Sequence, residues 1–409
     1  MSDAGGDEGE MVTSGPGRPV VRLRPKADAR RIRHGYPWVW ADQLVTDRRS
    51  RALAPGTIAT LEDAGRVPLA TVAVNPGSKI IARVLDRDPA ADIDGAWLAA
   101  RLDTAAVLRE RLYGAPFWRW IHAEADGLPG VVIDRFGDVA VCQPNAAWAE
   151  MLIDEIADAL VSRGVSTVVV NGEGRARALE GLEGGIRLLR GAPEGPVAVG
   201  MNGAIYMADL LGGQKTGLYY DQRENHAFAA RFAAGQDVLD VFSHVGGFGL
   251  AALAAGAASA LLVDASDPAL ALARQGAERM GAADRVETRT GDAFDAMAAL
   301  AGEERRFGLV ISDPPAFAPA KPALQAGLRA YERAARMAAG LAAPGGVLVL
   351  CSCSHAADLA RFRAACVAGI GKAGRSARLL RTGFAAPDHP EMPALAETGY
   401  LKALTFALD

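Results

Sequence analysis

The sequence predicts a multidomain α/β protein. A small N-terminal β-barrel and a small central α/β or α+β domain should precede a doubly wound, mostly parallel sheet. A chain of 409 residues has room for two to three domains. Short apolar runs broken by turn residues follow the N-terminus and indicate the barrel. From about residue 197, apolar strands alternate with Ala-rich helices, which is typical of right-handed βαβ crossovers.

The N-terminal half divides into three predicted parts. Residues 1–17 carry four acidic residues, no basic residue and no apolar period, so we expect a disordered tail. Residues 18–90 should form the barrel, since short apolar runs recur there at 20–23, 57–61, 69–74 and 80–85. Residues 91–196 should form the central domain, with helices at about 93–113 and 148–163 and strands at 130–134, 139–142 and 167–170.

Residues 197–409 should form the parallel sheet and its covering helices. We expect strands at 237–242, 260–264, 286–290, 309–313 and 347–352, and a final strand at about 400–408 that closes the sheet. Helices are expected at about 223–234, 247–256, 267–281, 293–301, 323–341 and 356–370. Ligands of such sheets bind at the carboxyl ends of the strands.

Composition excludes several classes of protein. No stretch reaches the eighteen apolar residues of a membrane span, and the acidic start does not resemble a signal peptide, so we expect a cytoplasmic protein with no membrane partner. Four cysteines are too few for a disulfide framework. Residues 18–51 carry ten basic and three acidic residues although the whole chain has a net charge of -4. This local excess suits a polyanion such as RNA.

The loop after the first strand of the sheet predicts a nucleotide-like ligand. Ser243, Gly246, Gly247 and Phe248 lie in this loop and at the start of the next helix. Glycine permits close backbone approach, and the helix N-terminus offers unpaired N–H groups. The alternative is that these glycines serve only tight packing.

Acidic residues follow the next two strands. Asp264 is placed to accept hydrogen bonds from ribose hydroxyls, and Asp292 to accept one from an adenine amino group. Both a nicotinamide cofactor and S-adenosylmethionine fit this pattern. Helix capping is the alternative for each acid, and we expect Asp267 to be an N-cap.

The fourth strand discriminates between the cofactors because it runs into Asp313-Pro314-Pro315-Ala316-Phe317. The two prolines fix an extended backbone without N–H donors, so that its carbonyls can face a flat heterocycle on which Phe317 can stack. Nicotinamide enzymes have no need of this arrangement. Asp-Pro-Pro at this position indicates a nucleic-acid methyltransferase.

The fifth strand ends in cysteines. A thiolate at Cys351 or Cys353 is placed to attack carbon 6 of a cytosine, which makes carbon 5 nucleophilic toward a methyl sulfonium. The alternative is a pair of buried, inert cysteines. No second Cys/His pair accompanies Cys353 and His355, so we expect no metal site.

Polar and aromatic residues are mixed densely at 213–223, just before the sheet. Asp221 is suited to the amino group of an amino-acid ligand and Arg223 to its carboxylate. An exposed helix N-terminus with Asp221 as its cap is the alternative.

The basic region interleaves arginines with aromatic residues. Arg33 and Trp38 lie in its segment 30–40, Arg22 precedes that segment, and Arg83 lies on a later strand of the same barrel. Arginine suits phosphates, and aromatic rings stack on unpaired bases, so we expect these residues to bind RNA. Trp38 fits the barrel core equally well.

Taken together, these motifs resemble the bacterial ribosomal large-subunit RNA methyltransferases that join a PUA domain, a central α/β domain and a Rossmann-like class I S-adenosylmethionine-dependent domain. The resemblance covers nearly the whole chain from about Arg22. It rests on His34-Gly-Tyr-Pro-Trp38, the segment 75–84, the segment 124–136, Lys215-Thr-Gly217 through Asp221-Gln222-Arg223, Phe242-Ser-x-x-Gly-Gly-Phe248, Asp313-Pro-Pro-x-Phe317 and Ser352-Cys-Ser354.

The resemblance implies 5-methylcytosine as the product, S-adenosylmethionine as the cofactor and large-subunit ribosomal RNA as the partner. It implies Cys353 as the nucleophile, with Cys351 a bystander and Asp313 a second catalytic residue, and a target base beside Pro314, Pro315 and Phe317. It implies a cofactor pocket formed by Asp221, Gln222, Arg223, Ser243, Gly246, Gly247, Phe248, Asp264, Asp292 and Asp313. His244 and His355 depart from the usual pattern. Methylation of an RNA base nitrogen, an RNA-binding ribosome-assembly factor and a homodimer stay open.

Overall fold

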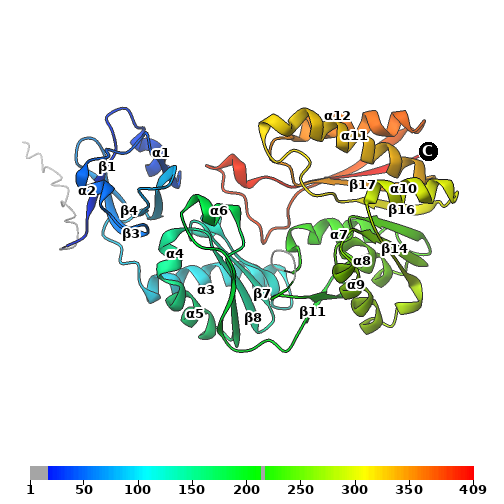
Figure 1. The fold of residues 1–409 in the computed structure, drawn as a ribbon, viewed down its shortest axis with the longest axis horizontal. Helices are drawn as coiled ribbons and strands as arrows, with labels where there is room; N and C mark the ends of the chain where they lie inside the picture. The colour runs from blue at the N-terminus through cyan, green and yellow to red at the C-terminus, as the bar shows by residue number, and fades with distance from the viewer. Residues whose placement is uncertain (1–16, 213–216) are drawn as a thin grey trace, which may run out of the picture.

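The computed structural model describes residues 17–212 and 217–409. All but the last residue of the predicted tail, and residues 213–216 of the segment before the sheet, lie outside this part. The chain forms three units in sequence order, an N-terminal barrel, a central domain and a C-terminal sheet domain (Figure 1). The exact boundaries between these units stay predictions.

The N-terminal unit is a five-stranded sheet of order β1-β3-β4-β5-β2. Its elements are β1 (Val20–Arg22), α1 (Ala29–Arg33), β2 (Trp38–Trp40), α2 (Arg48–Arg51), β3 (Thr57–Glu62), β4 (Pro68–Val74) and β5 (Ile80–Asp86). An isolated bridge between Leu23 and Leu44 links the two edge strands. The sheet therefore closes on itself around an apolar core that includes Val39 and Val72, as the sequence predicted.

The central unit is a five-stranded sheet of order β10-β9-β8-β7-β6. Its strands are β6 (Phe117–His122), β7 (Val131–Phe136), β8 (Val139–Pro144), β9 (Thr167–Asn171) and β10 (Ile186–Arg190), and its helices are α3 (Gly95–Leu112), α4 (Ala147–Met151), α5 (Ile153–Val161) and α6 (Arg175–Leu179). Helices α3 and α5 bury Leu98 and Ile156 in one core with Trp120 and Trp148. The first and last strands of this sheet were not predicted.

The C-terminal unit is a seven-stranded sheet of order β15-β14-β13-β16-β17-β19-β18. Its strands are β13 (Asp237–Val241), β14 (Ser259–Asp264), β15 (Val286–Thr290), β16 (Phe307–Ser312), β17 (Ala342–Ser352), β18 (Ala377–Gly383) and β19 (Lys402–Leu408). Its helices are α7 (Arg223–Ala230), α8 (Gly247–Ala254), α9 (Asp267–Arg279), α10 (Ala293–Gly302), α11 (Leu324–Leu341) and α12 (Leu359–Lys372). The sheet has an apolar core on each face, which confirms the doubly wound fold.

Two features of this sheet differ from prediction. The last strand, β19, does not lie at the edge but runs antiparallel between β17 and the unpredicted β18. Strand β18 escaped prediction because an edge strand with mostly exposed residues has no apolar alternation. A hairpin of β11 (Val197–Met201) and β12 (Ala204–Ala208) was also missed, and it covers α8 and α9. No helix in the described part of the chain is long and apolar enough to cross a membrane.

Candidate active site at the carboxyl ends of the strands

The loop after β13 has the geometry of a ligand-binding turn. Gly246 has φ +82°, a conformation that favours glycine, and its N–H donates to the Ser243 carbonyl over 2.8 Å. Phe242 and His244 adopt positive φ values of 63° and 50°, which side-chain-bearing residues rarely do. Helix α8 begins at Gly247, so its N-terminus points toward the site. Ser243, Gly246 and Gly247 thus lie where the sequence placed them.

Phe248 requires a correction. Its side chain is 4% exposed and packs edge-on against His226, with ring centroids 4.4 Å apart. The ring therefore belongs to the apolar core under α8 and does not line the cofactor pocket. The sequence could not separate these roles, since an aromatic residue in the first turn of a helix serves either.

Asp264 joins two loops at the end of β14. One carboxylate oxygen accepts from the His244 N–H and the other from the Ser266 N–H, each over 2.8 Å. Asp264 therefore fixes the turn after β13, and the remaining lone pairs of its oxygens are available to a ribose. Ser266, not Asp267, caps α9, because its hydroxyl accepts from the Ala269 N–H over 3.3 Å.

Asp292 caps helix α10, which is the alternative role that the sequence left open for it. Its Oδ1 accepts from the Phe294 and Asp295 N–H groups at the start of α10, over 2.8 and 3.1 Å. The side chain is exposed at the carboxyl end of β15. Capping uses one carboxylate oxygen, so a contact between the second oxygen and an adenine amino group remains a proposal.

Sequence reasoning missed Asp240. It lies on β13 with no exposed surface, its Oδ2 accepts from the Gly249 N–H over 2.8 Å, and burial raises its pKa to about 7. The available signal was an acid within the apolar strand Val238-Leu-Asp-Val241. Burying an acid among apolar residues costs free energy, so an acid at such a position indicates a function.

Several buried oxygens near this edge of the sheet have no hydrogen-bond partner among the described residues. They are Asp221 Oδ1, Asp240 Oδ1, Ser243 Oγ and Ser312 Oγ. Buried polar atoms are normally paired, so unpaired ones indicate a polar ligand. S-adenosylmethionine carries an ammonium, ribose hydroxyls and an adenine amino group, which supply donors for such oxygens. The residues present therefore fit this cofactor.

Asp221 and Gln222 meet the end of the sheet from the segment before α7. Gln222 Nε2 donates to Asp313 Oδ2 over 3.0 Å, and Gln222 Oε1 accepts from Asn225 over 2.7 Å. Asp221 Oδ2 accepts from the Tyr400 hydroxyl over 2.5 Å. The structure thus brings together two predicted cofactor residues and the Asp-Pro-Pro motif.

Arg223 contacts the central domain. Its guanidinium stacks on Tyr113, 3.8 Å from the ring centroid, and donates to the Phe117 carbonyl. Both partners belong to the central domain. Arg223 therefore contributes to the contact between the two domains, which sequence could not show because it needs the neighbouring domain. Its Nε and Nη1 are buried and have no hydrogen-bond partner among the described residues, so a contact with a ligand carboxylate stays a prediction.

The turn after β17 holds Cys353 beside the Asp-Pro-Pro loop. Ser352 and Ser354 are fully buried, and the Tyr331 hydroxyl lies 2.9 and 2.7 Å from their Oγ atoms. The Ala318 N–H donates to Ser354 Oγ over 2.9 Å. Two loops that lie some forty residues apart in sequence are therefore joined.

The two cysteines at this strand end have different environments. Cys351 is 1% exposed, and burial raises the pKa of its thiol well above the usual value. Cys353 is half-buried. This difference agrees with a nucleophilic Cys353 and an inert Cys351.

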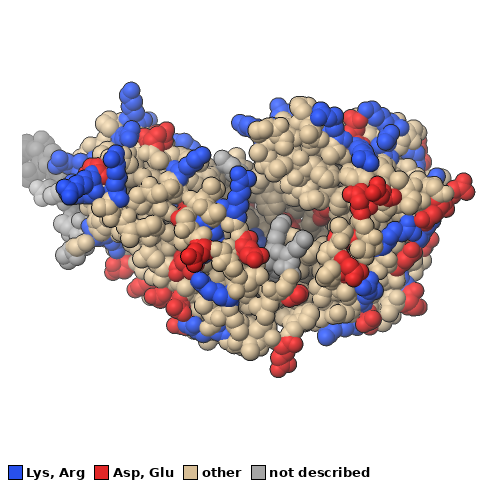
Figure 2. All heavy atoms as spheres, in the orientation of Figure 1, with Lys and Arg blue, Asp and Glu red and all other residues tan. Residues whose placement is uncertain are grey.

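The Asp-Pro-Pro-Ala-Phe segment is only partly open. Pro314 is buried and Pro315 is exposed. Phe317 is half-buried, with its ring centroid 5.0 Å from that of Tyr331 and 6.2 Å from that of Phe294. The face shown in Figure 2 is hollowed between the central and C-terminal domains.

The predicted RNA-binding residues of the barrel are engaged within the protein. Arg22 pairs with Glu62 over 3.0 Å, and Arg33 pairs with Asp63 over 3.0 Å. Both arginines remain accessible, with 38% and 48% of their side chains exposed. The half-buried Trp38 donates its indole N–H to Glu124 of the central domain over 2.8 Å.

Arg83 requires a correction. It pairs with Glu124 over 3.1 Å and with Glu180 over 3.0 Å, and 12% of its side chain is exposed. A guanidinium between two carboxylates of the central domain stabilises the joint between the domains and is not presented to RNA.

Other arginines of the barrel offer a basic surface. Arg30, Arg31, Arg48 and Arg51 are exposed, and none has an ion pair within the described part of the chain. Figure 2 shows Lys and Arg side chains over this domain. Two of them lie on α1 and two on α2, and we call the four together the basic surface.

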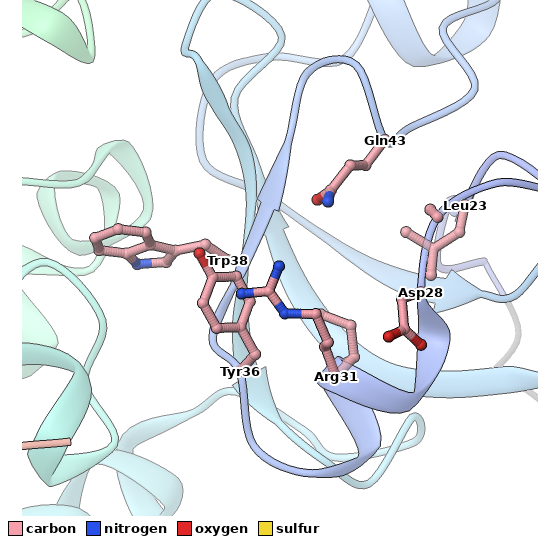
Figure 3. Close-up of a pocket in the computed structure, with 8 residues that line it drawn as sticks. Leu23, Asp28, Arg31, Tyr36, Trp38 and Gln43 are labelled. Atoms are coloured by element: carbon pink, nitrogen blue, oxygen red, sulfur yellow. The ribbon is translucent and has the colours of Figure 1, made fainter. Parts of the chain in front are cut away.

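A small pocket adjoins the basic surface (Figure 3). The Arg31 guanidinium lies over the Tyr36 ring, 3.9 Å from its centroid, and Asp28, Trp38 and Gln43 also line the pocket, which has room for about one water molecule. A cation, aromatic rings and an amide are the groups that recognise unpaired bases.

Comparisons with known proteins agree with this architecture. Residues 21–87 match the PUA-like domain family, and residues 180–407 match the S-adenosylmethionine-dependent methyltransferase family. The chain is 34% identical to a ribosomal RNA large subunit methyltransferase I of Alteromonas mediterranea, covering 94% of this chain and 97% of the relative. It is 33% identical to one of Vibrio vulnificus, with the same coverage.

Solved structures share the fold. A protein from Streptococcus mutans assigned as a SAM-dependent methyltransferase superposes with a TM-score of 0.77 at 18% identity, over 95% of this chain and all of that one. A second structure, of a protein assigned as a methyltransferase and solved with SAH, superposes with a TM-score of 0.78 at 18% identity, over 95% of this chain and 99% of that one. The unpaired oxygens, the glycine turn and the strand-end acids at one edge of the sheet agree with these comparisons. The chain belongs to the ribosomal RNA large subunit methyltransferase I family of S-adenosylmethionine-dependent methyltransferases.

Proposed function

We propose that the protein transfers a methyl group from S-adenosylmethionine to carbon 5 of a cytosine in large-subunit ribosomal RNA, with Cys353 as the nucleophile. The observation that carries the proposal is the position of Cys353. It is the half-buried cysteine of the four, and its turn is joined to the Asp-Pro-Pro loop by Ser354. The relatives named above, which are large-subunit ribosomal RNA methyltransferases, support the substrate class.

The cofactor would be held by the residues at the strand ends. Asp264 would take the ribose hydroxyls, Asp292 the adenine amino group, and Asp221 the ammonium of the amino-acid end. Gly246 lets the backbone approach the ligand, and Gln222 orients Asp313. When bound, S-adenosylmethionine supplies an electrophilic methyl group on a sulfonium.

The chain's own residues would perform the steps around that methyl group. The target cytosine leaves its stack and enters the hollow beside Pro315 and Phe317. The Cys353 thiolate adds to carbon 6, so that carbon 5 becomes nucleophilic and takes the methyl group. A base then removes the carbon 5 proton, the electron pair restores the ring double bond, and the bond between carbon 6 and sulfur breaks to release Cys353.

RNA would reach this hollow from the barrel. The basic surface supplies charges for phosphates. In this proposal the exposed arginines of the basic surface bind RNA in place of Arg83. Arg22 and Arg33 remain proposed RNA contacts beside them.

Nucleoside mass spectrometry tests the proposal. Large-subunit RNA is incubated with isotope-labelled S-adenosylmethionine and wild-type protein, Cys353→Ala or the matched control Cys351→Ala. We expect labelled 5-methylcytosine with wild type and Cys351→Ala, and none with Cys353→Ala. Label on a base nitrogen that survives in Cys353→Ala would overturn the covalent mechanism. Absence of label from every base, despite RNA binding, would favour a ribosome-assembly factor.

A further inference from the structure

A buried lysine lies beneath the turn that carries Cys353. Lys402 is the first residue of β19 and pairs in register with Ser352, the neighbour of Cys353. Lys402 is 6% exposed, and its Nζ donates to the carbonyls of Ser354 and Ala357 over 2.7 and 2.9 Å. The turn after β17 therefore folds around the ammonium group.

This ammonium has no ion-pair partner. Within residues 17–212 and 217–409, no carboxylate oxygen lies within 4.0 Å of Lys402. Of the other buried cations in this part of the chain, Arg109 and Arg177 each pair with an acid, whereas Arg223 packs on Tyr113 without an ion pair. The two carbonyl groups accept hydrogen bonds from the ammonium but do not neutralise its positive charge. A buried lysine without a counter-ion is costly, so its position calls for an anion that forms during function.

The Cys353 thiolate is the anion that the structure offers. Burial lowers the pKa of Lys402, while negative charge at Cys353, and at the exposed Asp358, raises it. An electrostatic interaction is mutual, so an ammonium stabilised by the thiolate stabilises the thiolate to the same extent.

The other groups around Cys353 do not supply this charge. Tyr331 and Tyr400 interact with it electrostatically, and burial raises the pKa of both phenols, which keeps them neutral. Asp313 and Asp221 are acidic and oppose a second negative charge. His355 lies in the same turn, and its ring faces Tyr400 with centroids 5.8 Å apart. Lys402 is the cation whose hydrogen bonds hold this turn, so it is placed to offset the two acids.

We propose that Lys402 is a positioning residue that holds the Cys353 turn and provides the counter-charge for the Cys353 thiolate. This proposal rests on the proposed function, in which Cys353 attacks the base as a thiolate. It assigns a role in the reaction to a residue of the last strand, which no strand-end motif identifies.

Alkylation of the thiol tests the proposal without methyl transfer. The rate at which iodoacetamide modifies Cys353 is followed by peptide mass spectrometry between pH 6 and pH 10. The full-length proteins are wild type, Lys402→Gln, which keeps a donor but not the charge, Lys402→Arg, which keeps the charge, and Lys372→Gln. Lys372 lies on the surface of α12 with 60% of its side chain exposed, so its variant removes one lysine charge at a distance from the turn.

We expect the wild-type profile to inflect below the ordinary cysteine value of about 8.5. Lys402→Gln should slow alkylation at pH 7 about tenfold, which corresponds to one pH unit of displacement, and its profile should rejoin that of wild type at high pH. Lys402→Arg should restore most of the rate, and Lys372→Gln should match wild type. A Lys402→Gln profile that overlays that of wild type overturns the proposal.

A wild-type inflection at or above 8.5 overturns it too, and this result needs no variant to fold. Failure of the proposed function is distinguishable, because full methylation by Cys353→Ala would refute the nucleophile while leaving the wild-type alkylation profile unchanged. If both proposals hold, kcat/KM for methylation falls in Lys402→Gln at neutral pH and recovers as the pH rises.

Discussion

Replacement of Asp240 by Asn makes the stability of the catalytic domain less sensitive to pH. Asp240 has no exposed surface and accepts a hydrogen bond from the Gly249 N–H. Asn has the same shape and keeps an oxygen acceptor at that position, but it cannot ionise. The variant therefore isolates the cost of a buried carboxylate on β13.

The expected magnitude follows from the shift of the Asp240 pKa, which burial raises from 3.8 to about 7. Below about pH 3.8 this carboxyl is protonated in both the folded and the unfolded protein and costs nothing. As the pH rises, the unfolded chain releases the proton first, so folding becomes less favourable until the folded group also ionises near pH 7. A shift of about three units corresponds to about 4 kcal/mol above that pH.

Differential scanning calorimetry at pH 5, 6, 7 and 8, without cofactor, checks this. About two of those units lie between pH 5 and pH 7, which corresponds to about 2.7 kcal/mol across the series. One kcal/mol moves the melting temperature of a domain of this size by about 2–4 °C, so the melting temperature of Asp240→Asn should rise by about 5–11 °C relative to wild type from pH 5 to pH 8. Any constant cost of the buried amide cancels in this comparison. Asp237→Asn, an exposed position on the same strand, is the control and should show no such trend. A difference between wild type and Asp240→Asn that stays constant from pH 5 to pH 8 would refute the reasoning.

Two further predictions concern the barrel. Glu180 is 6% exposed and accepts from Arg83, so Glu180→Gln should weaken the joint between barrel and central domain by about 2–4 kcal/mol. The segment between the two domains should then be cut faster in limited proteolysis, and an unchanged cutting rate would contradict the assignment. Arg31→Glu with Arg48→Glu should weaken RNA binding and reduce its salt dependence by about 0.9 per lost phosphate contact, at an unchanged melting temperature. Binding curves that keep the wild-type salt slope would exclude the basic surface.

Local sequence determined much of the catalytic sheet. The strand ends that carry Asp264, Asp292, Asp313 and Cys353 were predictable because alternation of apolar strands and helices fixes the register, and parallel strands bring their carboxyl ends to one edge. The glycine turn was predictable for a similar reason, since Gly246 needs a positive φ that favours glycine.

Tertiary structure decided which side chains those patterns leave available. Arg83 has the charge to bind phosphate, but acids from the central domain pair with it, and an aromatic ring of the same domain packs on Arg223. Phe248 packs inward because His226 of α7 lies beneath it. None of these contacts can be read from residues near each other in sequence.

The sequence by itself therefore determined the fold class, the order of the units and the strand ends that build the site, because periodicity and glycine geometry are local. The family resemblance already singled out Cys353, and the tertiary structure added a physical difference, since Cys351 is buried and Cys353 is half-buried. Only the tertiary structure revealed Asp240 and Lys402 as buried ionisable groups without full compensation. Burial and electrostatic environment arise from elements that meet in space. Lys402 reaches the Cys353 turn only because β19 inserts between β17 and β18.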